Sequence, residues 1–299
     1  MAESNQNQKF SLLLPEGWKS IISSWLTEDA PSFDVGGYVA GDQHRVAYLY
    51  LKNDGVLAGV PFVDALFEHV NCKVSWLEEE GSEHVGVRAD SPVVVGTVEG
   101  AANRLLQAER VALNVLARAS GIATRCRAFR KCCEEHKFKG VVAGSRKTTP
   151  LFRLVEKYAM VVGGVDPHRM DLSSMVMIKD NHIAAAGSIR SAVEAAQQVS
   201  GFSVKIEVEC RNDDDAVKAV NAGASVVMLD NFGPEKAAAS AAALRAKFPD
   251  KHFLIEVSGG VSAEALSSYF SDHIDVISTS AAHQGVPHID FSMKIHRHK

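Results

Sequence analysis

Two adjacent cations, Arg146 and Lys147, follow a Val-rich run in the segment GSRKTTP, residues 144–150. A solvated charge run usually lies on a polar helix face or in a linker, with acidic residues interleaved. Here the cations come directly after a run that predicts a buried strand, and a second apolar stretch follows them. The doublet therefore points to an anion-binding site at the end of a strand.

Three more basic residues, His168, Arg169 and Lys179, follow in the same part of the chain. Unpaired buried ions are costly, so a cluster of cations needs a counter-charge. An anionic ligand supplies it, and a mixture of Arg and Lys suits one that carries both planar carboxylates and phosphate. For each cation alone the alternative stays open, namely an ion pair with a nearby Asp in a structural network.

Two acidic residues, Glu209 and Asp230, end two further apolar runs. Neighbouring strands lie about 5 Å apart, so carboxylates at two such strand ends come within reach of one metal ion. Oxygen ligands beside a phosphate site favour Mg²⁺, which usually binds one or two carboxylates plus substrate oxygens. An ion pair of Glu209 with Lys205 or Arg211 is the structural alternative.

The segment Ser258-Gly259-Gly260 leads into VSAEALSSYF, which predicts a helix. Backbone amides of a Gly-rich turn at a helix N-terminus bind phosphate. We therefore expect a phosphate cradle after this predicted strand.

The elements that must position these residues alternate in type from residue 139 onward. Helix-like stretches, with start signals at Asn212 and Gly233-Pro234, separate short apolar runs. Strand alternating with helix predicts parallel strands and right-handed crossovers. The predicted strands cover residues 139–143, 174–178, 203–208, 225–229, 252–257 and 274–277.

The residues at the strand ends distinguish between two parallel architectures. In an open doubly wound sheet, ligands gather at one switch point, whereas in a barrel every strand end faces one site. Functional residue types occur after all six predicted strands, including Ser278 after the last. They favour the barrel, and neither nucleotide-binding glycine motif, GxGxxG after a strand or GxxxxGK[ST], is present.

The first hundred or so residues have a different pattern. They mix short β-like runs with one helix signal, PFVDALFEHV, in which Pro61 occupies the first turn. Clustered strands with a helix on one face predict an α+β domain. A long helical pattern then runs from Asn103 to about Lys131, and we expect an interruption near Ser120-Gly121 because glycine is a weak helix former.

Composition excludes several classes of protein. The 299 residues suffice for about two domains, and a net charge of -4 argues against a nucleic-acid-coating surface. No stretch approaches the roughly 18 apolar residues of a membrane span, and the polar N-terminus lacks signal-peptide features. Five cysteines, an odd number, suit reduced thiols. We expect a cytoplasmic protein, with the nucleus open as a second compartment, and neither a membrane nor a nucleic acid as partner.

Six segments resemble, in order and spacing, the quinolinate phosphoribosyltransferase family, and the polar, divergent N-terminus resembles that of its eukaryotic members. The segments are ERVALNVLARASGIAT (109–124), GSRKTTPLFRLVEKYA (144–159), GGVDPHRMDLSSMVMIKDNHI (163–183), IEVEC (206–210), VVMLDNF (226–232) and EVSGG (256–260). The resemblance implies an N-terminal α/β sandwich, residues 1–120 joined by the C-terminal residues 285–299. It also implies a C-terminal α/β barrel of the type II phosphoribosyltransferases over residues 121–284.

The resemblance implies an activity and a site. The activity is transfer of the phosphoribosyl group of phosphoribosyl diphosphate to quinolinate with decarboxylation, giving nicotinate mononucleotide, diphosphate and CO2 in de novo NAD biosynthesis. Mg²⁺ is the implied cofactor. The implied catalytic residues are Lys147, Lys179, Glu209 and Asp230, of which Glu209 and Asp230 serve Mg²⁺ and the ribose hydroxyls. Quinolinate is expected at Arg146, Thr148, His168 and Arg169, and the 5-phosphate at Ser258, Gly259 and Gly260.

The resemblance further implies a homodimer whose active site takes Arg110 from the partner subunit, and it leaves a hexamer, a trimer of dimers, open. One departure concerns Ser280, which stands where related enzymes often carry a phosphate-contacting Gly. Its backbone N–H and hydroxyl still suit a phosphate, so we expect binding to be kept.

Three other functions remain open at this point. A barrel aldolase or lyase would use Lys147 or Lys179 as a Schiff base. A non-catalytic anion-binding protein would use the same cations without a reaction. A transferase acting on nicotinate would need no decarboxylation.

Overall fold

The structure is a computed structural model that describes residues 10–296, so the outer limits of the predicted domains, residues 1 and 299, lie outside it. The chain divides into two compact units. The first contains the residues up to 127, residues 151–164 and the residues from 286 onward, and the second contains residues 128–150 and 165–285.

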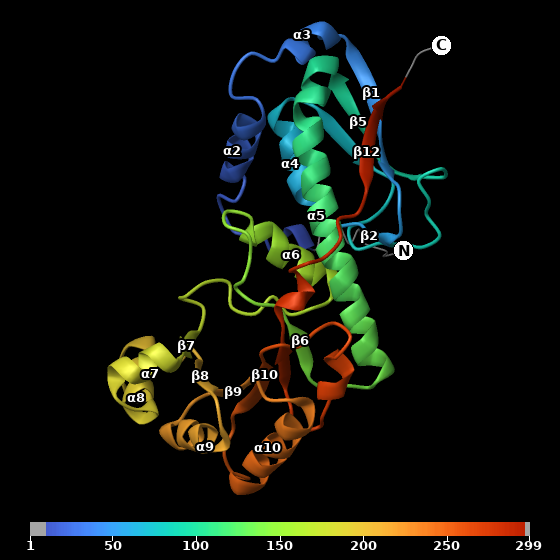
Figure 1. The fold of residues 1–299 in the computed structure, drawn as a ribbon. Coiled ribbons are helices and arrows are strands. Elements are labelled where there is room, and N and C mark those ends of the chain that lie inside the picture. The colour runs from blue at the N-terminus through green and yellow to red at the C-terminus, as the bar shows by residue number, and fades with distance from the viewer. Residues whose placement is uncertain (1–9, 297–299) are drawn as a thin grey trace, which may run out of the picture. The chain divides into compact units, whose positions relative to one another are not determined.

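The first unit is built on a four-stranded antiparallel sheet with the order β12-β1-β5-β3 (Figure 1). Its strands are β1 (His44–Leu51), β3 (Lys73–Trp76), β5 (Val93–Ala101) and β12 (Phe291–Ile295). In the second half of β1 buried and half-buried residues alternate, so one face of the sheet is covered. The remaining elements are α2 (Ser20–Asp29), α3 (Val35–Ala40), α4 (Val60–His69) and a small pair, β2 (Gly55–Val56) with β4 (Glu83–His84). The predicted α/β sandwich is confirmed, and Pro61 lies in the first turn of α4.

Helix α5 (Ala102–Glu135) runs without a break, so the interruption expected near Ser120-Gly121 was wrong. Gly121 is needed for a close approach instead, because a β-carbon there would lie 2.3 Å from the Pro287 carbonyl oxygen. The Ser120 hydroxyl accepts the Ala58 N–H at 3.0 Å. Tertiary contacts therefore explain why small residues occupy positions 120 and 121, and the helix does not end there.

Helix α6 (Arg153–Gly163) belongs to the first unit, whereas the predicted barrel, residues 121–284, included this segment. The Arg118 guanidinium, on α5, contacts the fully buried Glu156 carboxylate at 2.8 Å. Arg127 also donates to the Val162 carbonyl at 3.2 Å. Because a buried charge needs a partner, these contacts hold α6 against α5.

The second unit contains a six-stranded parallel sheet with the order β6-β11-β10-β9-β8-β7. Its strands are β6 (Val141–Ala143), β7 (Val176–Ile178), β8 (Ile206–Cys210), β9 (Val226–Asp230), β10 (Leu254–Ser258) and β11 (Val276–Ser278). Its helices are α7 (Asp180–Ala186), α8 (Ile189–Ser200), α9 (Asp213–Ala222), α10 (Pro234–Lys247) and two short 3-10 turns, η1 (Leu266–Tyr269) and η2 (Ser280–Ala282). All six predicted strands and the N-caps Asn212 and Gly233 are confirmed.

The strand order identifies this sheet as an α/β barrel. Strands β7 to β11 follow one another in chain order, and β6, the first, lies beside β11, the last. A doubly wound sheet would reverse direction at a switch point, and this sheet does not. Asp166 adds a bridge on the free edge of β6. Figure 1 shows α8, α9 and α10 outside the strands.

The helix expected over residues 261–270 was wrong, since only the turn η1 forms there. An α-helix would bond the Ala265 N–H to the Val261 carbonyl. Instead the Thr279 hydroxyl donates to the Val261 carbonyl at 2.6 Å, and the Ala265 N–H donates to the Ser262 hydroxyl at 3.2 Å. Side-chain hydrogen bonds therefore occupy the backbone groups that would otherwise form the first turn of an α-helix.

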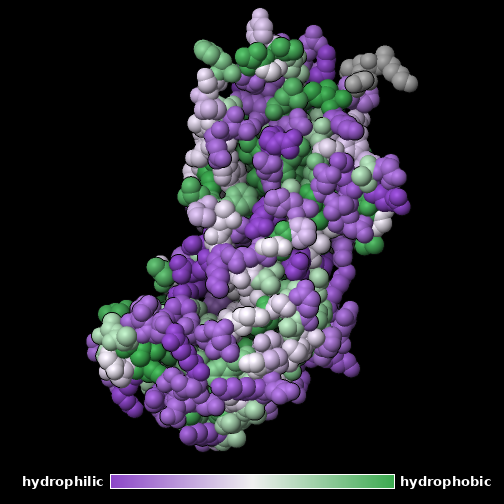
Figure 2. All heavy atoms as spheres, in the orientation of Figure 1, coloured by the Kyte–Doolittle hydropathy of each residue, from purple (hydrophilic) through white to green (hydrophobic). Residues whose placement is uncertain are grey.

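An exposed apolar patch surrounds α3, and Figure 2 shows hydrophobic residues gathered over that helix. Phe33 is 97% exposed and Tyr38 is 89% exposed, with Val35 and Val39 beside them in sequence. Contiguous exposed apolar surface is typical of an interaction site. Among the described residues, no helix is both long enough and apolar enough to cross a bilayer.

Candidate active site

A cavity of about 440 Å³ lies at the carboxyl ends of the barrel strands. It brings together most of the predicted site residues, namely Arg146, Lys147, His168, Arg169, Lys179, Glu209, Asp230, Ser258, Gly259 and Gly260. Because the carboxyl ends of all strands in a barrel face one site, residues far apart in sequence meet here.

Three predicted residues are not among those that line this cavity in the described part of the chain. Arg110 is exposed on α5, in the first unit. Thr148 lies in the loop after β6, where its hydroxyl is 3.5 Å from the Arg146 carbonyl oxygen. Ser280 begins η2, and Ser278, at the end of β11, lines the cavity instead.

The cations of the GSRKTTP segment lack protein counter-charges in the described residues. Arg146 Nε is buried and has no hydrogen-bond partner there, while Lys147 is exposed to the cavity. Burial, followed by the neighbouring Arg146, lowers the pKa of Arg169. Since a buried donor without a partner is costly, this part of the cavity is suited to an anion.

Lys179, Glu209 and Asp230 form the opposite-charge part of the cavity. Lys179 Nζ contacts the Glu209 carboxylate at 2.5 Å. The ion-pair partner of Glu209 is therefore Lys179, and not Lys205 or Arg211, the structural alternatives considered from the sequence. Strands β8 and β9 are paired, so Glu209 and Asp230 do end neighbouring strands. Burial, followed by the charge of Glu209, raises the pKa of Asp230. Two carboxylates that repel one another in this way suit a divalent cation.

Two buried carboxylates below the cavity were missed by the sequence analysis. Glu207 is 0% exposed and Glu256 is 3% exposed, and each lies two residues before a cavity residue on its strand. Burial, followed by the charge of Glu256, raises the pKa of Glu207 to about 10. A single acidic residue inside an apolar strand run, as in both IEV segments, is a signal that could have found them.

Glu207, Glu256 and His168 each offer one ligand atom within 4.8 Å of the others, a spacing that could hold a metal ion. His168 and Glu256 already contact each other, with 3.3 Å between Nε2 and Oε1. The Nδ1 atom of the same ring accepts the Arg169 backbone N–H at 2.7 Å. Because Mg²⁺ prefers oxygen ligands and this cluster includes a histidine nitrogen, Glu209 and Asp230 remain the magnesium candidates.

Gly259 and Gly260 form the predicted cradle, although no α-helix begins there. Both have a left-handed backbone, with φ of 90° and 66°. A β-carbon on Gly259 would lie 2.4 Å from Asn231 Oδ1, so only glycine fits beside that residue. Asn231, which the sequence analysis missed, lines the cavity, and its backbone N–H donates to the Ser258 carbonyl at 2.8 Å.

Ser145 and His283 are a further pair that the sequence analysis did not assign to the site. The Ser145 hydroxyl lies 3.0 Å from His283 Nε2 and accepts the Lys147 backbone N–H at 3.1 Å. His283 is 0% exposed. The pair anchors the loop that carries the two cations, and no spacing signal in the sequence marked it.

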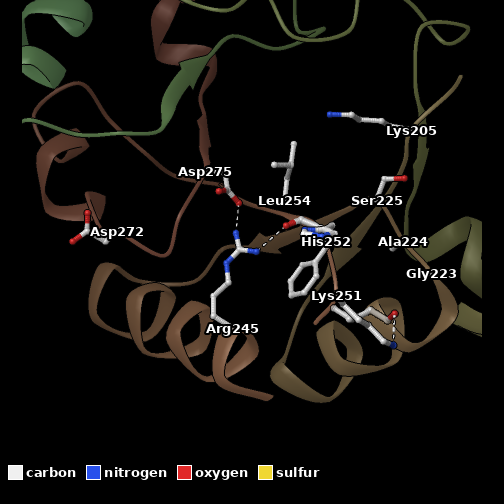
Figure 3. Close-up of a pocket in the computed structure, with 12 residues that line it drawn as sticks. Lys205, Gly223, Ala224, Ser225, Arg245, Lys251, His252, Leu254, Asp272 and Asp275 are labelled. Atoms are coloured by element: carbon white, nitrogen blue, oxygen red, sulfur yellow. Dashed lines mark hydrogen bonds and ion pairs between the residues drawn. The ribbon is translucent and has the colours of Figure 1, made fainter. Parts of the chain in front are cut away.

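A larger hollow, about 730 Å³, lies at the opposite ends of the strands (Figure 3). Two of the cations that line it, Arg245 and Lys251, have protein partners. Arg245 contacts Asp275 at 2.5 Å and donates to the Phe253 carbonyl at 2.8 Å, and Lys251 donates to the Val220 carbonyl at 3.3 Å. Because these charges are satisfied, size alone does not make this hollow the better candidate.

Comparison with known proteins identifies the family of the chain. The profile of "Quinolinate phosphoribosyl transferase, N-terminal domain" matches residues 27–120, and that of the C-terminal domain matches residues 122–294. The nicotinate-nucleotide pyrophosphorylase (carboxylating) of Rattus norvegicus is 48% identical over 95% of this chain and 93% of its own. That of Dictyostelium discoideum is 44% identical over 97% of this chain and 99% of its own.

A solved structure agrees with these sequence matches. The nicotinate-nucleotide pyrophosphorylase from Francisella tularensis superposes with a TM-score of 0.82 at 28% identity, covering 93% of this chain and 95% of that one. The predicted architecture, an α/β sandwich plus a barrel, is thereby confirmed. The chain belongs to the quinolinate phosphoribosyl transferase family.

Proposed function

We propose that this chain transfers the phosphoribosyl group of phosphoribosyl diphosphate to quinolinate with loss of CO2, giving nicotinate mononucleotide and diphosphate. The word "carboxylating" in the relatives' names describes the same reaction written in reverse. The observation that carries the proposal is the division of one cavity into a cationic part, with Arg146 Nε buried and unpartnered, and a carboxylate pair at Glu209 and Asp230.

Quinolinate binds at the cationic part of the cavity. Arg146 and Arg169 offer planar forks that match its two carboxylates, and His168 lies beside them. The ligand supplies the counter-charge that the described residues do not give to Arg146. Fixing the ring in this way aims the pyridine nitrogen at the ribosyl donor, so positioning takes the place of a protein nucleophile.

The ribosyl donor binds along Lys147, Lys179 and the glycine cradle. Ser258, Gly259 and Gly260 bind its 5-phosphate through backbone N–H groups and the Ser258 hydroxyl. Lys147 and Lys179 stabilise the charge that develops on diphosphate as the C1–O bond breaks through an oxocarbenium-like transition state.

Glu209 and Asp230 hold Mg²⁺ in this proposal, and the same carboxylates contact the ribose hydroxyls. When bound, the ion neutralises charge on the diphosphate leaving group. Lys179, which contacts Glu209 at 2.5 Å, keeps that carboxylate in place.

Decarboxylation follows from the new C–N bond. Once the pyridine nitrogen has attacked C1 of the ribose, the ring is a pyridinium and accepts the electron pair of the adjacent C–C bond. The carboxylate next to the nitrogen leaves as CO2, and a proton replaces it on the ring. The second carboxylate stays and becomes that of nicotinate mononucleotide.

The site is completed by a second copy of the chain. Arg110 is exposed on α5, so its guanidinium is accessible to a partner subunit, which supports its supply in trans. The exposed apolar patch at α3 supports association, and a hexamer of three such dimers is compatible with it. A cytoplasmic location suits the five free cysteines.

The experiment that tests the proposal is a diphosphate-release assay with the purified chain. We expect release to require quinolinate, phosphoribosyl diphosphate and Mg²⁺ together, and nicotinate not to replace quinolinate. If no diphosphate is released with all three present, a non-catalytic anion-binding protein becomes the better explanation. A covalent lysine adduct trapped by borohydride with a carbonyl substrate would instead favour the aldolase.

A further inference from the structure

A hydrogen-bond chain links the floor of the cavity to the loop that carries Arg169. The Ser278 hydroxyl donates to Glu256 Oε1 at 2.5 Å, and His168 Nε2 lies 3.3 Å from the same oxygen. On the other side of the ring, the Arg169 backbone N–H donates to His168 Nδ1 at 2.7 Å. Glu256 and Ser278 are 3% and 4% exposed, so water is largely excluded from this chain.

These contacts fix the tautomer of His168. A ring nitrogen that accepts a backbone N–H carries no proton of its own. Nδ1 is therefore the acceptor, and the ring proton is on Nε2, where it points at Glu256 Oε1. The Arg169 backbone N–H thus keeps Nδ1 unprotonated, and Glu256 accepts the hydrogen bond from the protonated Nε2.

The same contacts hold a strained backbone. His168 has φ of 57°, in the left-handed region that residues with a β-carbon avoid, and its N–H donates to Asp166 Oδ1 at 2.6 Å. Such a conformation persists only where its surroundings determine it. The imidazole, held by Glu256 on strand β10 of the barrel, is a side-chain anchor of this loop.

Arg169 is the residue that this loop presents to the cavity. Its backbone N–H is held by His168, and its Nη1 donates to the Met175 carbonyl at 3.1 Å. The backbone and the guanidinium of Arg169 are thus each held by a hydrogen bond. A loss of the first contact would let the guanidinium turn about the second.

We propose that Glu256 is a positioning residue that acts through the Nε2–H tautomer of His168 to hold the Arg169 backbone and so aim its guanidinium at a carboxylate of quinolinate. This role rests on the proposed function, in which Arg169 binds quinolinate. Glu256 itself touches no substrate in this account.

Two substitutions separate hydrogen bonding from charge. Glu256→Gln keeps an oxygen that accepts from Ser278 and His168 but removes the charge, and Glu256→Leu removes both. We expect Glu256→Leu to raise the KM for quinolinate by roughly tenfold or more, the effect of losing a buried hydrogen bond, with the KM for phosphoribosyl diphosphate little changed. Glu256→Gln should restore most of the affinity.

Ser240→Ala is the matched control, because Ser240 is a buried polar residue on α10 that does not line the cavity. It should leave both KM values unchanged. Equal effects of Glu256→Gln and Glu256→Leu would overturn the proposal in favour of a pure counter-charge, and equal rises in both KM values would overturn it in favour of a general structural role. If Glu256→Leu does not fold, Ser278→Ala tests the same chain of hydrogen bonds. It should also raise the KM for quinolinate.

A spectroscopic measurement tests the hydrogen bonds of His168 without measuring activity. Its result is therefore valid even if the proposed function is wrong. In protein labelled with ¹⁵N-histidine, His168→Asn assigns one ring among the 12 histidines. We expect wild-type His168 to show a protonated Nε2 and an unprotonated Nδ1, and Glu256→Gln to keep this pattern. A protonated Nδ1 in the wild-type protein, in either the Nδ1–H or the doubly protonated ring, would overturn the proposal.

Discussion

At the scale of single residues, the cavity is defined by charges that the protein does not neutralise itself. Arg146 Nε is buried without a partner in the described residues, whereas Arg245 on the opposite side of the barrel has Asp275. The sequence could mark both as cations but could not show which of them was paired. The difference between them lies in tertiary contacts.

Replacement of Arg146 tests the quinolinate site at this scale. Arg146→Ala should weaken quinolinate binding by about 2 kcal/mol or more, because a charged hydrogen bond is lost. Arg146→Lys should recover only part, since a point charge cannot replace a planar fork. Titration calorimetry with quinolinate measures both. Arg190→Ala, at an exposed cation paired with Glu194, is the control and should bind as the wild type does. Unchanged affinity in Arg146→Ala would contradict the assignment.

Glu80 gives a pH prediction for the first unit. Its carboxylate accepts the Gly59 and Val60 N–H groups, and burial raises its pKa from 4.5 to about 7. The folded state therefore binds a proton that the unfolded state has lost, so stability falls as pH rises from about 4.5 to about 7. The shift corresponds to about 3 kcal/mol.

Urea unfolding at several pH values checks this, followed by tryptophan fluorescence, because all three Trp residues lie in the first unit. Glu80→Gln does not titrate, so its stability should fall less over the same window. Parallel pH profiles for the two proteins would show that Glu80 does not titrate in that range.

At the level of helices and strands, the alternation of strand with helix and the N-cap residues predicted most of the secondary structure. The six barrel strands, α8, α9 and α10 follow from apolar runs separated by N-cap signals such as Asn212, whose side chain accepts the Asp215 N–H. The failures at Gly121 and at residues 261–270 share a cause. In each, a contact with a distant segment, the close approach of Pro287 or the hydrogen bond of Thr279, could not be read from the local pattern.

Gly121→Ala tests whether that close approach matters. Alanine is the better helix former, but its β-carbon would lie 2.3 Å from the Pro287 carbonyl oxygen. We expect a loss of about 2 kcal/mol in the free energy of unfolding, as for other overpacked sites. Gly36→Ala is the matched change in α3, where the β-carbon would meet only Asp34 Oδ1 at 3.5 Å. It should be neutral or stabilising, and a Gly121→Ala protein as stable as Gly36→Ala would contradict this explanation.

At the level of the whole molecule, the proposed site requires a second copy of the chain to supply Arg110. Sequence reasoning from residue types alone gave no reason to choose Arg110, an exposed residue on α5, and only the family resemblance pointed to it. The buried Glu207 and Glu256 were missed for the opposite reason. Their role depends on what lies across the barrel, which no local pattern encodes.

Mixing two inactive proteins tests the shared site. Arg110→Ala chains keep an intact cavity, and Lys147→Ala chains keep an intact Arg110. In a two-fold dimer each mixed pair regains one working site, so full exchange should restore roughly a quarter of the wild-type activity. A mixture that stays inactive, once subunit exchange is shown by mass spectrometry of tagged chains, would place Arg110 outside the partner's site.

In the proposed reaction, this chain joins quinolinate to a phosphoribosyl group and then removes the carboxylate next to the ring nitrogen. The most direct test uses quinolinate labelled with ¹⁴C at one carboxylate, with phosphoribosyl diphosphate and Mg²⁺. With the label next to the nitrogen, we predict one labelled CO2 for each diphosphate released. With the label on the other carboxylate, it should remain in the mononucleotide. Diphosphate release without labelled CO2 from the first substrate would contradict the account.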